Sequence, residues 1–146
     1  ASVNTHDMPP AAGYLEYGHV KLREQLGLLS GPVEEFQKSA TAEHNAMLNM
    51  LVEEGYLDKA ALDDEAANEN EIVDALYRGL KGSPCKLMAA SIVDAVGEKR
   101  TQNQPGTNNE YPNWRIPLAD GEGNVVPLEK LFDEPRLQEV TAIMRG

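Results

Sequence analysis

The stretch that decides the fold is PVEEFQKSATAEHNAMLNMLVEEG, residues 32–55. Side chains that suit a core recur in it every three or four residues, which places them on one face of an α-helix. The positions on that face are Val33, Phe36, Ala40, His44, Met47 and Leu51. Ser30 can cap the start, Pro32 lies near the first turn, and Gly55 lies beyond the end. The pattern therefore predicts a long amphipathic helix between Pro32 and Gly55.

Weaker helical patterns lie on both sides of this helix. Residues 4–14 are rich in proline and glycine and predict a loop, and the leucine spacing that follows predicts a helix over 16–28. Residues 58–71 carry six acidic residues and few large apolar side chains, which indicates a solvated loop or frayed turn. A third amphipathic stripe predicts a helix over 71–82, which Gly82 and the following proline end.

The second half of the chain contains one segment that periodicity leaves open. Residues 87–93, LMAASIV, suit a strand buried on both faces, yet their alanines and methionine also fit a helix. Residues 101–118 combine prolines, a glycine and amides with large rings, which predicts an ordered loop. Short helices are expected over 127–132 and from Pro135 onwards. The expected fold is mainly α-helical, with one or two strands.

Composition and charge exclude several classes of function. The 146 residues suit one domain, and 24 acidic against 13 basic side chains give a net charge of -11. Such a surface repels phosphate, so neither nucleic acid nor an anionic membrane is an expected partner. No stretch approaches the roughly 18 apolar residues that span a bilayer. The single cysteine, Cys85, cannot form an internal disulfide, and no leader-like segment begins the chain, so the cytoplasm is the expected compartment.

The first candidate site is the run Thr5-His6-Asp7. A hydroxyl, an imidazole and a carboxylate lie next to one another, and Pro9 and Pro10 stiffen the backbone beyond them. A rigid polar cluster of this kind suits a catalytic or binding site. The residues alone equally allow Asp7 to cap a turn while His6 is solvated.

The second candidate site is the amide-rich loop. Its asparagines could hydrogen-bond sugar hydroxyls while Tyr111 or Trp114 packs against the apolar face of a sugar. These asparagines are Asn103, Asn108, Asn109 and Asn113. In the alternative interpretation Trp114 anchors the loop in the core, and Arg115 binds a buried carboxylate or carbonyl. Both interpretations bury Trp114.

Other reactive side chains predict no chemistry. His44 lies on the apolar face of the long helix and is expected to be a hydrogen-bonded packing residue. Cys85 is expected to be a small buried thiol. The histidines lack the spacing of a zinc site, and the acidic residues at 63–71 lack the alternating ligands and glycine of a calcium loop. We therefore predict no metal and no cofactor.

Both candidate sites match one family. THDMPPAAGY with HVKLREQLGLL behind it, and QNQPGTNNEYPNWRIPL later, resemble the amylomaltases, the 4-alpha-glucanotransferases of glycoside hydrolase family 77 that act on maltodextrins. SPCKLMAASIVDAVGE and VVPLEKLFDEPRLQEV continue the resemblance in order along the chain. It implies that residues 1–146 are the C-terminal part of a (β/α)8 TIM-barrel catalytic domain, from the end of strand seven to the C-terminus. Residues 86–93 would then be the eighth strand.

The resemblance also implies roles for Asp7, His6 and Asn103. Asp7 matches the third carboxylate of the family, which stabilises an oxocarbenium-like transition state and so counts as catalytic. His6 would bind the same sugar ring, and Asn103 matches an asparagine on the donor side of the cleft. The resemblance assigns no role to Trp114 or Arg115, and from the residues alone we expect both to be structural. The expected partners are maltodextrin or another α-1,4-glucan and the remainder of the parent catalytic domain.

The retaining mechanism of the family needs two further carboxylates. A nucleophile and an acid/base lie roughly 5–5.5 Å apart in such enzymes, and in this family they come from earlier strands that nothing here matches. We therefore expect the isolated chain to be inactive, and we expect the segment 87–93 to pair with another copy or to become helical.

Two alternatives from other classes stay open. One is a carbohydrate-binding module that uses Trp114, Tyr111 and the amides without turnover. The other is a helical interaction domain whose acidic face docks a basic partner.

Overall fold

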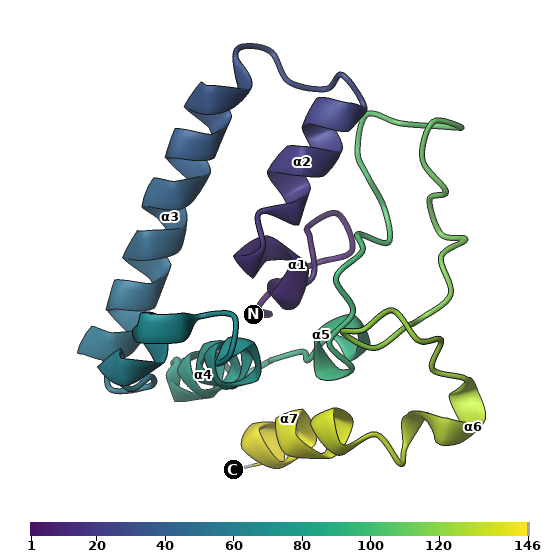
Figure 1. The fold of residues 1–146 in the computed structure, drawn as a ribbon. Coiled ribbons are helices and arrows are strands. Elements are labelled where there is room, and N and C mark those ends of the chain that lie inside the picture. The colour runs from purple at the N-terminus through teal and green to yellow at the C-terminus, as the bar shows by residue number, and fades with distance from the viewer. Residues whose placement is uncertain (146) are drawn as a thin grey trace.

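The chain consists of helices joined by long loops (Figure 1). The computed structural model describes residues 1–145. The helices are α1 (Ala11–Leu15), α2 (Gly18–Gln25), α3 (Val33–Glu53), the 3-10 helix η1 (Lys59–Asp64), α4 (Glu69–Gly82), α5 (Ile92–Ala95), α6 (Leu128–Leu131) and α7 (Pro135–Arg145). Within the described residues, isolated bridges join Ser2 to Ala89 and Ala119 to Val125. The prediction of a mainly helical chain is confirmed.

The long helix lies where the sequence predicts it. Pro32 precedes its first residue, and Gly55 has a left-handed φ of 75° just beyond its end. The helix expected over 16–28 is present but shorter, as α2, and Tyr17 with a φ of 58° separates it from α1. The prediction of a loop over residues 4–14 is wrong for residues 11–14, which are helical. Pro10 leads directly into the helical run that opens with two alanines, good helix formers.

Residues 58–71, expected to be a solvated loop or frayed turn, are mostly exposed but more regular than expected, since they contain η1 and the start of α4. Asp58 caps η1 by accepting a hydrogen bond from the Ala60 backbone N–H at 2.9 Å. Ala61 of η1 is buried, and the side chain of Asn68 donates back to the Ala61 carbonyl at 3.3 Å. A few small apolar residues among the acids therefore suffice to fold this segment onto the core.

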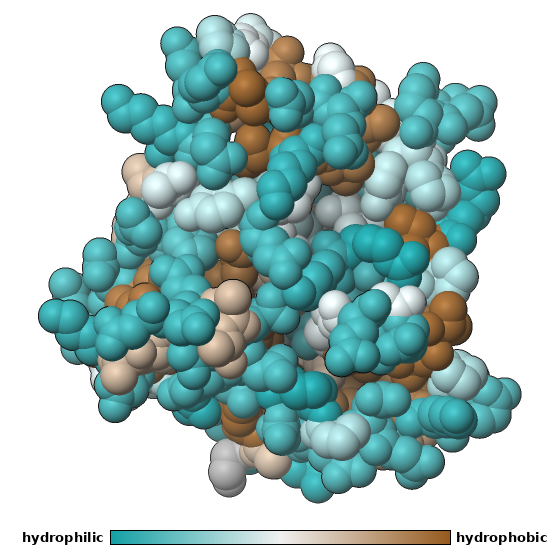
Figure 2. Space-filling view, in the orientation of Figure 1, coloured by the Kyte–Doolittle hydropathy of each residue, from teal (hydrophilic) through white to brown (hydrophobic). Residues whose placement is uncertain are grey.

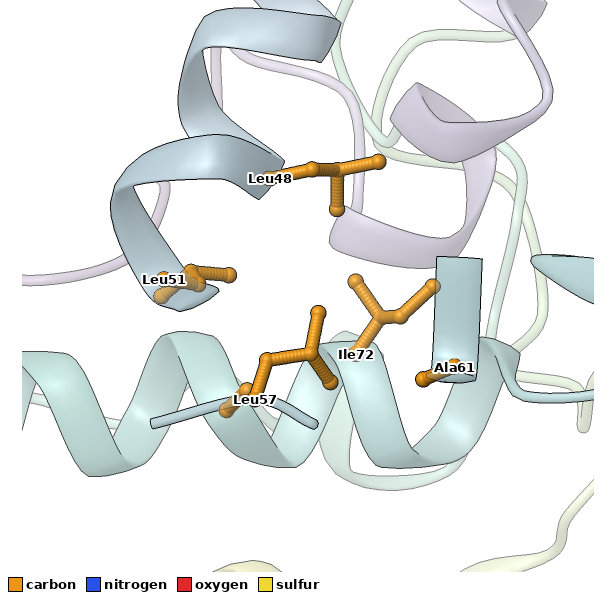
Figure 3. Packing of buried hydrophobic residues seen from close by; sticks show 6 residues of the cluster. Leu48, Leu51, Leu57, Ala61 and Ile72 are labelled. Carbon is orange, nitrogen blue, oxygen red and sulfur yellow. The ribbon is translucent and has the colours of Figure 1, made fainter. Parts of the chain in front are cut away.

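Two cores meet at α4. The first lies between α3, η1 and α4 (Figure 3), and its residues are Leu48, Leu51, Leu57, Ala61, Ile72 and Ala75. The second joins the other face of α4 to α1, α5 and α7 through Ala11, Val73, Tyr77, Ala95 and Val140. The helix α4 thereby connects the N-terminal helices to the C-terminal one (Figure 1).

The segment 87–93, which periodicity left open between a doubly buried strand and a helix, contains one bridged residue and the first two residues of α5. Only Ala89 pairs, in a parallel bridge with Ser2, where its N–H donates to the Ala1 carbonyl at 3.0 Å. Leu87 is 85% exposed because no strand covers its other side, and α5 begins at Ile92. Cys85 is exposed, contrary to the predicted buried thiol, because it lies in the turn that follows α4.

The glycine of α1 makes a close backbone contact that a side chain would prevent. A Cβ on Gly13 would collide with the carbonyl oxygen of Lys99, at the start of the amide-rich loop. Alanine ordinarily stabilises a helix relative to glycine by about 1 kcal/mol. Here we expect Gly13→Ala to lower the free energy of unfolding by roughly 1–3 kcal/mol, because backbone must shift. Urea denaturation followed by circular dichroism measures the change.

The matched control is Gly31→Ala. A Cβ there would meet only side-chain atoms of Glu35 and Phe36 at 3.8 Å, an ordinary contact distance. Its free energy of unfolding should stay within about 0.5 kcal/mol of the parent value. Equal stability of the Gly13→Ala chain would show that α1 and the loop are not held in backbone contact.

Candidate active site

The two candidate motifs meet in the folded chain. The side-chain N–H of Asn103 donates a hydrogen bond of 2.6 Å to Oδ1 of Asp7, across 96 residues of sequence. Nε2 of His6 lies 3.3 Å from the other carboxylate oxygen of Asp7. All three predicted site residues therefore lie together. The Asp7 side chain is 49% exposed, so a ligand can reach it.

A buried carboxylate holds both ends of the His6–Asp7 turn. The side-chain amide of Asn4 donates to both oxygens of Asp94 at 2.8 Å, and the N–H of Ala11 donates to Oδ1 at 2.7 Å. The hydroxyl of Tyr77 donates to Oδ2 at 2.7 Å and accepts from the N–H of Ser91 at 3.1 Å. Burial raises the pKa of the Asp94 carboxyl, although these hydrogen bonds oppose the shift. Burial and the nearby Asp94 charge also raise the pKa of Tyr77.

Sequence reasoning missed Asp94. Its signal was present, since Asp94 is a lone carboxylate within the apolar run SIVDAV. A charged residue in such a position is almost never fully buried unless it is paired. Its partners, Asn4 and Tyr77, lie too far away in sequence for that signal to identify them.

The amide-rich loop is held by its own side chains. Asn113 accepts from the Gln104 N–H at 2.7 Å and donates to the Thr107 hydroxyl at 2.8 Å. The Tyr111 hydroxyl donates to the carbonyl of Thr101 at 2.6 Å. Asn113 and Tyr111 therefore order the loop, as predicted for a loop of this composition, and Asn103 is the amide that contacts Asp7.

A buried carboxylate near the loop is bound by Arg100 and not by Arg115. Arg115 is exposed, whereas Arg100 donates through two nitrogens to the buried Glu98, at 2.9 and 2.7 Å. The Ala119 N–H donates to the same carboxylate at 3.0 Å. Burial raises the pKa of Glu98, but the hydrogen bonds and charge of Arg100 outweigh it and hold that pKa below its usual range. The predicted buried contact of Arg115 is wrong because Arg100, two residues from Glu98, already fills it.

The predicted burial of Trp114 is also wrong. Its side chain is 64% exposed, and its φ of 61° lies in the left-handed region. The turn that contains it is fixed by hydrogen bonds from the Trp114 N–H to the Gln102 carbonyl and from the Arg115 N–H to the Pro112 carbonyl, at 2.9 and 3.0 Å. The ring consequently lies beside that of His6, with centroids 5.3 Å apart. Both rings line a cleft of about 310 Å³.

His44 lies outside this site and has the packing role predicted for it. It is buried on α3, and its Nε2 lies 2.6 Å from a carboxylate oxygen of Glu65. The rings of Tyr17 and Tyr14 stack on it at centroid distances of 5.1 and 6.2 Å. These contacts account for a histidine on the apolar face of a helix.

Neither a membrane span nor a metal cluster is found in the described part of the chain. None of the helices within residues 1–145 is both long and apolar enough to cross a bilayer. Over the same residues, no three His, Cys, Asp or Glu side chains are grouped so that they could hold a metal ion. Figure 2 shows one face of the molecule, mostly hydrophilic and interrupted by separate apolar patches.

Comparison with known proteins gives consistent matches. Residues 1–121 match the family model described as 4-alpha-glucanotransferase. Over all 146 residues the chain is 46% identical to the 4-alpha-glucanotransferase of Mycobacterium tuberculosis strain H37Rv, and over 141 residues it is 27% identical to that of Haemophilus influenzae strain Rd. It spans 20% and 19% of the length of these relatives. The crystal structure of amylomaltase from Corynebacterium glutamicum superposes on 98% of the chain with a TM-score of 0.85 and 36% identity, and 21% of that chain is covered.

Proposed function

The chain belongs to the 4-alpha-glucanotransferase family, and from this premise we propose that residues 1–146 are the C-terminal part of the (β/α)8 catalytic domain of a maltodextrin glucanotransferase. The parallel bridge between Ser2 and Ala89 supports this assignment. Parallel neighbours in a barrel need a long crossover between them, usually helical. Here α1 to α4 lie between the two bridged residues, which would be the end of strand seven and part of strand eight.

The proposed reaction moves a segment of α-1,4-glucan from one maltodextrin to another by retaining double displacement. Asp7 would stabilise the positive charge that develops on the donor sugar, while His6 and Asn103 bind that sugar. The observation that carries this proposal is the 2.6 Å hydrogen bond between Asn103 and Asp7. It unites two motifs, each of which contributes a polar group suited to one sugar ring.

The bond-breaking pair would come from the rest of the parent domain. A double displacement of this type uses a nucleophilic carboxylate and an acid/base carboxylate, so the proposal includes no cofactor. It includes no nucleic acid and no membrane surface as a partner, because the net charge of -11 disfavours both. We assign the reaction to the cytoplasm. A chain with a single cysteine is compatible with that reducing compartment, and so is a maltodextrin substrate.

The chain alone should not transfer glucan. Incubated with maltotriose, it should yield neither glucose nor longer maltodextrins, because the proposal places the nucleophile and the acid/base in the rest of the parent domain. The full-length enzyme, assayed in parallel by chromatography of the products, should yield both. Robust glucose release by the 146-residue chain would contradict the proposed division of the site.

Calorimetric titration with maltoheptaose tests the first alternative, a carbohydrate-binding module without turnover. An incomplete cleft should bind this glucan far more weakly in the isolated chain than in the full-length enzyme. Equal affinity in both would favour a self-sufficient carbohydrate-binding module over part of a catalytic domain.

A further inference from the structure

Trp114 lies in an unusual backbone conformation. A bulky side chain at a positive φ is a conformational outlier, and such residues cluster at functional sites. The turn around Trp114 is held on both sides, since Asn113 binds Gln104 and the Trp114 N–H binds the Gln102 carbonyl. These contacts keep a large apolar ring 64% exposed.

The exposed ring of Trp114 lines a cleft that has both apolar and polar side chains. Trp114, His6, Thr5 and Gln102 line the same cleft of about 310 Å³, at the lower end of the range for small-molecule sites. The cleft combines an aromatic surface with a hydroxyl, an imidazole and an amide. A glucosyl unit has the matching combination, because hydroxyls surround an apolar ring face.

Gln102 supplies a second, independent indication. Its Nε2 is buried, and among residues 1–145 it has no hydrogen-bond partner. Leaving a buried donor unpaired is destabilising, so native structures seldom do so without a reason. Gln102 lines the cleft through its other atoms, so its amide must turn toward the cleft for a sugar hydroxyl to supply the missing acceptor.

We propose that Trp114 is a sugar-binding platform, on which one glucosyl ring of the α-1,4-glucan stacks while Gln102 donates to one of its hydroxyls. The inference rests on the proposed function and extends it to a subsite. Asp7 does not line this cleft, whereas His6 does and also contacts Asp7. The stacked unit is therefore adjacent to the sugar held by Asp7. Trp114 acts in binding and takes no part in the displacement.

The test uses the full-length enzyme with Trp114→Ala and Trp114→Phe. Loss of an aromatic contact worth up to about 1.5 kcal/mol should raise the Kd for maltoheptaose, measured by calorimetry, and the KM for it roughly 10-fold. The kcat should stay within about 3-fold, since uniform binding is what is lost. Phenylalanine keeps a stacking face and should return both constants to within about 3-fold of the parent values.

The matched control is Phe132→Ala, which removes another exposed aromatic ring, 75% accessible, outside the cleft. It should change neither constant. Unchanged Kd in Trp114→Ala would overturn the platform. If Trp114 instead packs against the rest of the parent domain, Trp114→Ala should lower the thermal unfolding midpoint and leave the Kd unchanged. That result would also overturn the platform.

The calorimetric arm also separates this inference from the proposed function. Absence of glucan transfer by the unsubstituted enzyme would contradict the proposed function, whereas the platform is judged by the Kd for maltoheptaose. If the unsubstituted enzyme does not bind maltoheptaose, the platform is overturned as well.

Discussion

Replacement of Asp7 by asparagine in the full-length enzyme should lower kcat for maltotriose disproportionation by about 10²–10³-fold, the range for loss of one preorganised electrostatic contact to a transition state. Asparagine keeps the size of the side chain and one oxygen that can accept from Asn103. The turn should therefore keep its geometry while the negative charge is lost. Since the positive charge on the sugar develops only in the transition state, KM should change much less than kcat.

The control for charge is Glu24→Gln. Glu24 lies exposed on α2, and its substitution removes the same formal charge without touching the site. Its kinetics should match those of the unsubstituted enzyme. If Asp7→Asn retained activity within about 3-fold of that enzyme, Asp7 would have no catalytic role, and the helical interaction domain would become the better interpretation.

Replacement of Asp94 by alanine should be the most destabilising single substitution proposed here, with a loss of about 3 kcal/mol or more in the free energy of unfolding. Asp94 is only 1% exposed, and it accepts hydrogen bonds from Asn4, Ala11 and Tyr77. Each buried donor left without an acceptor costs about 1–3 kcal/mol. Relief of the burial penalty of the carboxylate offsets part of this sum, as its raised pKa indicates. Urea denaturation of the chain, followed by circular dichroism, measures the loss.

Two controls bracket the effect of Asp94→Ala. Tyr77→Phe removes one donor of the network and should cost about 1–2 kcal/mol, since the N–H of Ser91 also loses its acceptor. Asp133→Ala removes an exposed carboxylate and should stay within about 0.5 kcal/mol. A loss for Asp94→Ala no larger than that for Asp133→Ala would mean that the network does not hold the turn.

Sequence patterns predicted a helix well where its apolar residues form one continuous face. The spacing from Val33 to Leu51 predicted α3 almost to its ends, because capping and breaking residues lie beside the stripe. The expectation for residues 58–71 missed the 3-10 helix because the acidic residues dominate the sequence pattern. In the fold, the few apolar side chains among them, Ala61 and Leu62, pack on the core. Tertiary packing overrides composition when a neighbouring helix offers an apolar surface.

The candidate site was predicted in part for a related reason. The chemistry of His6, Asp7 and Asn103 is visible in the residue types, and the structure brings the three together. The exposure of Trp114 was not predictable, because large rings are normally buried and its left-handed φ comes from hydrogen bonds within the loop. Asp94 was missed because its importance lies in partners distant in sequence.

The span of chain between Asp7 and Asn103 has a consequence for the order in which the molecule folds. Their hydrogen bond closes a loop of 96 residues, whereas the contacts between α3, η1 and α4 join segments that are neighbours in sequence. Closing a long loop costs more entropy and slows folding, so local helical contacts are expected to form first. The contact between Asp7 and Asn103 should accordingly form last, after the helices have packed, and break first when the protein begins to unfold.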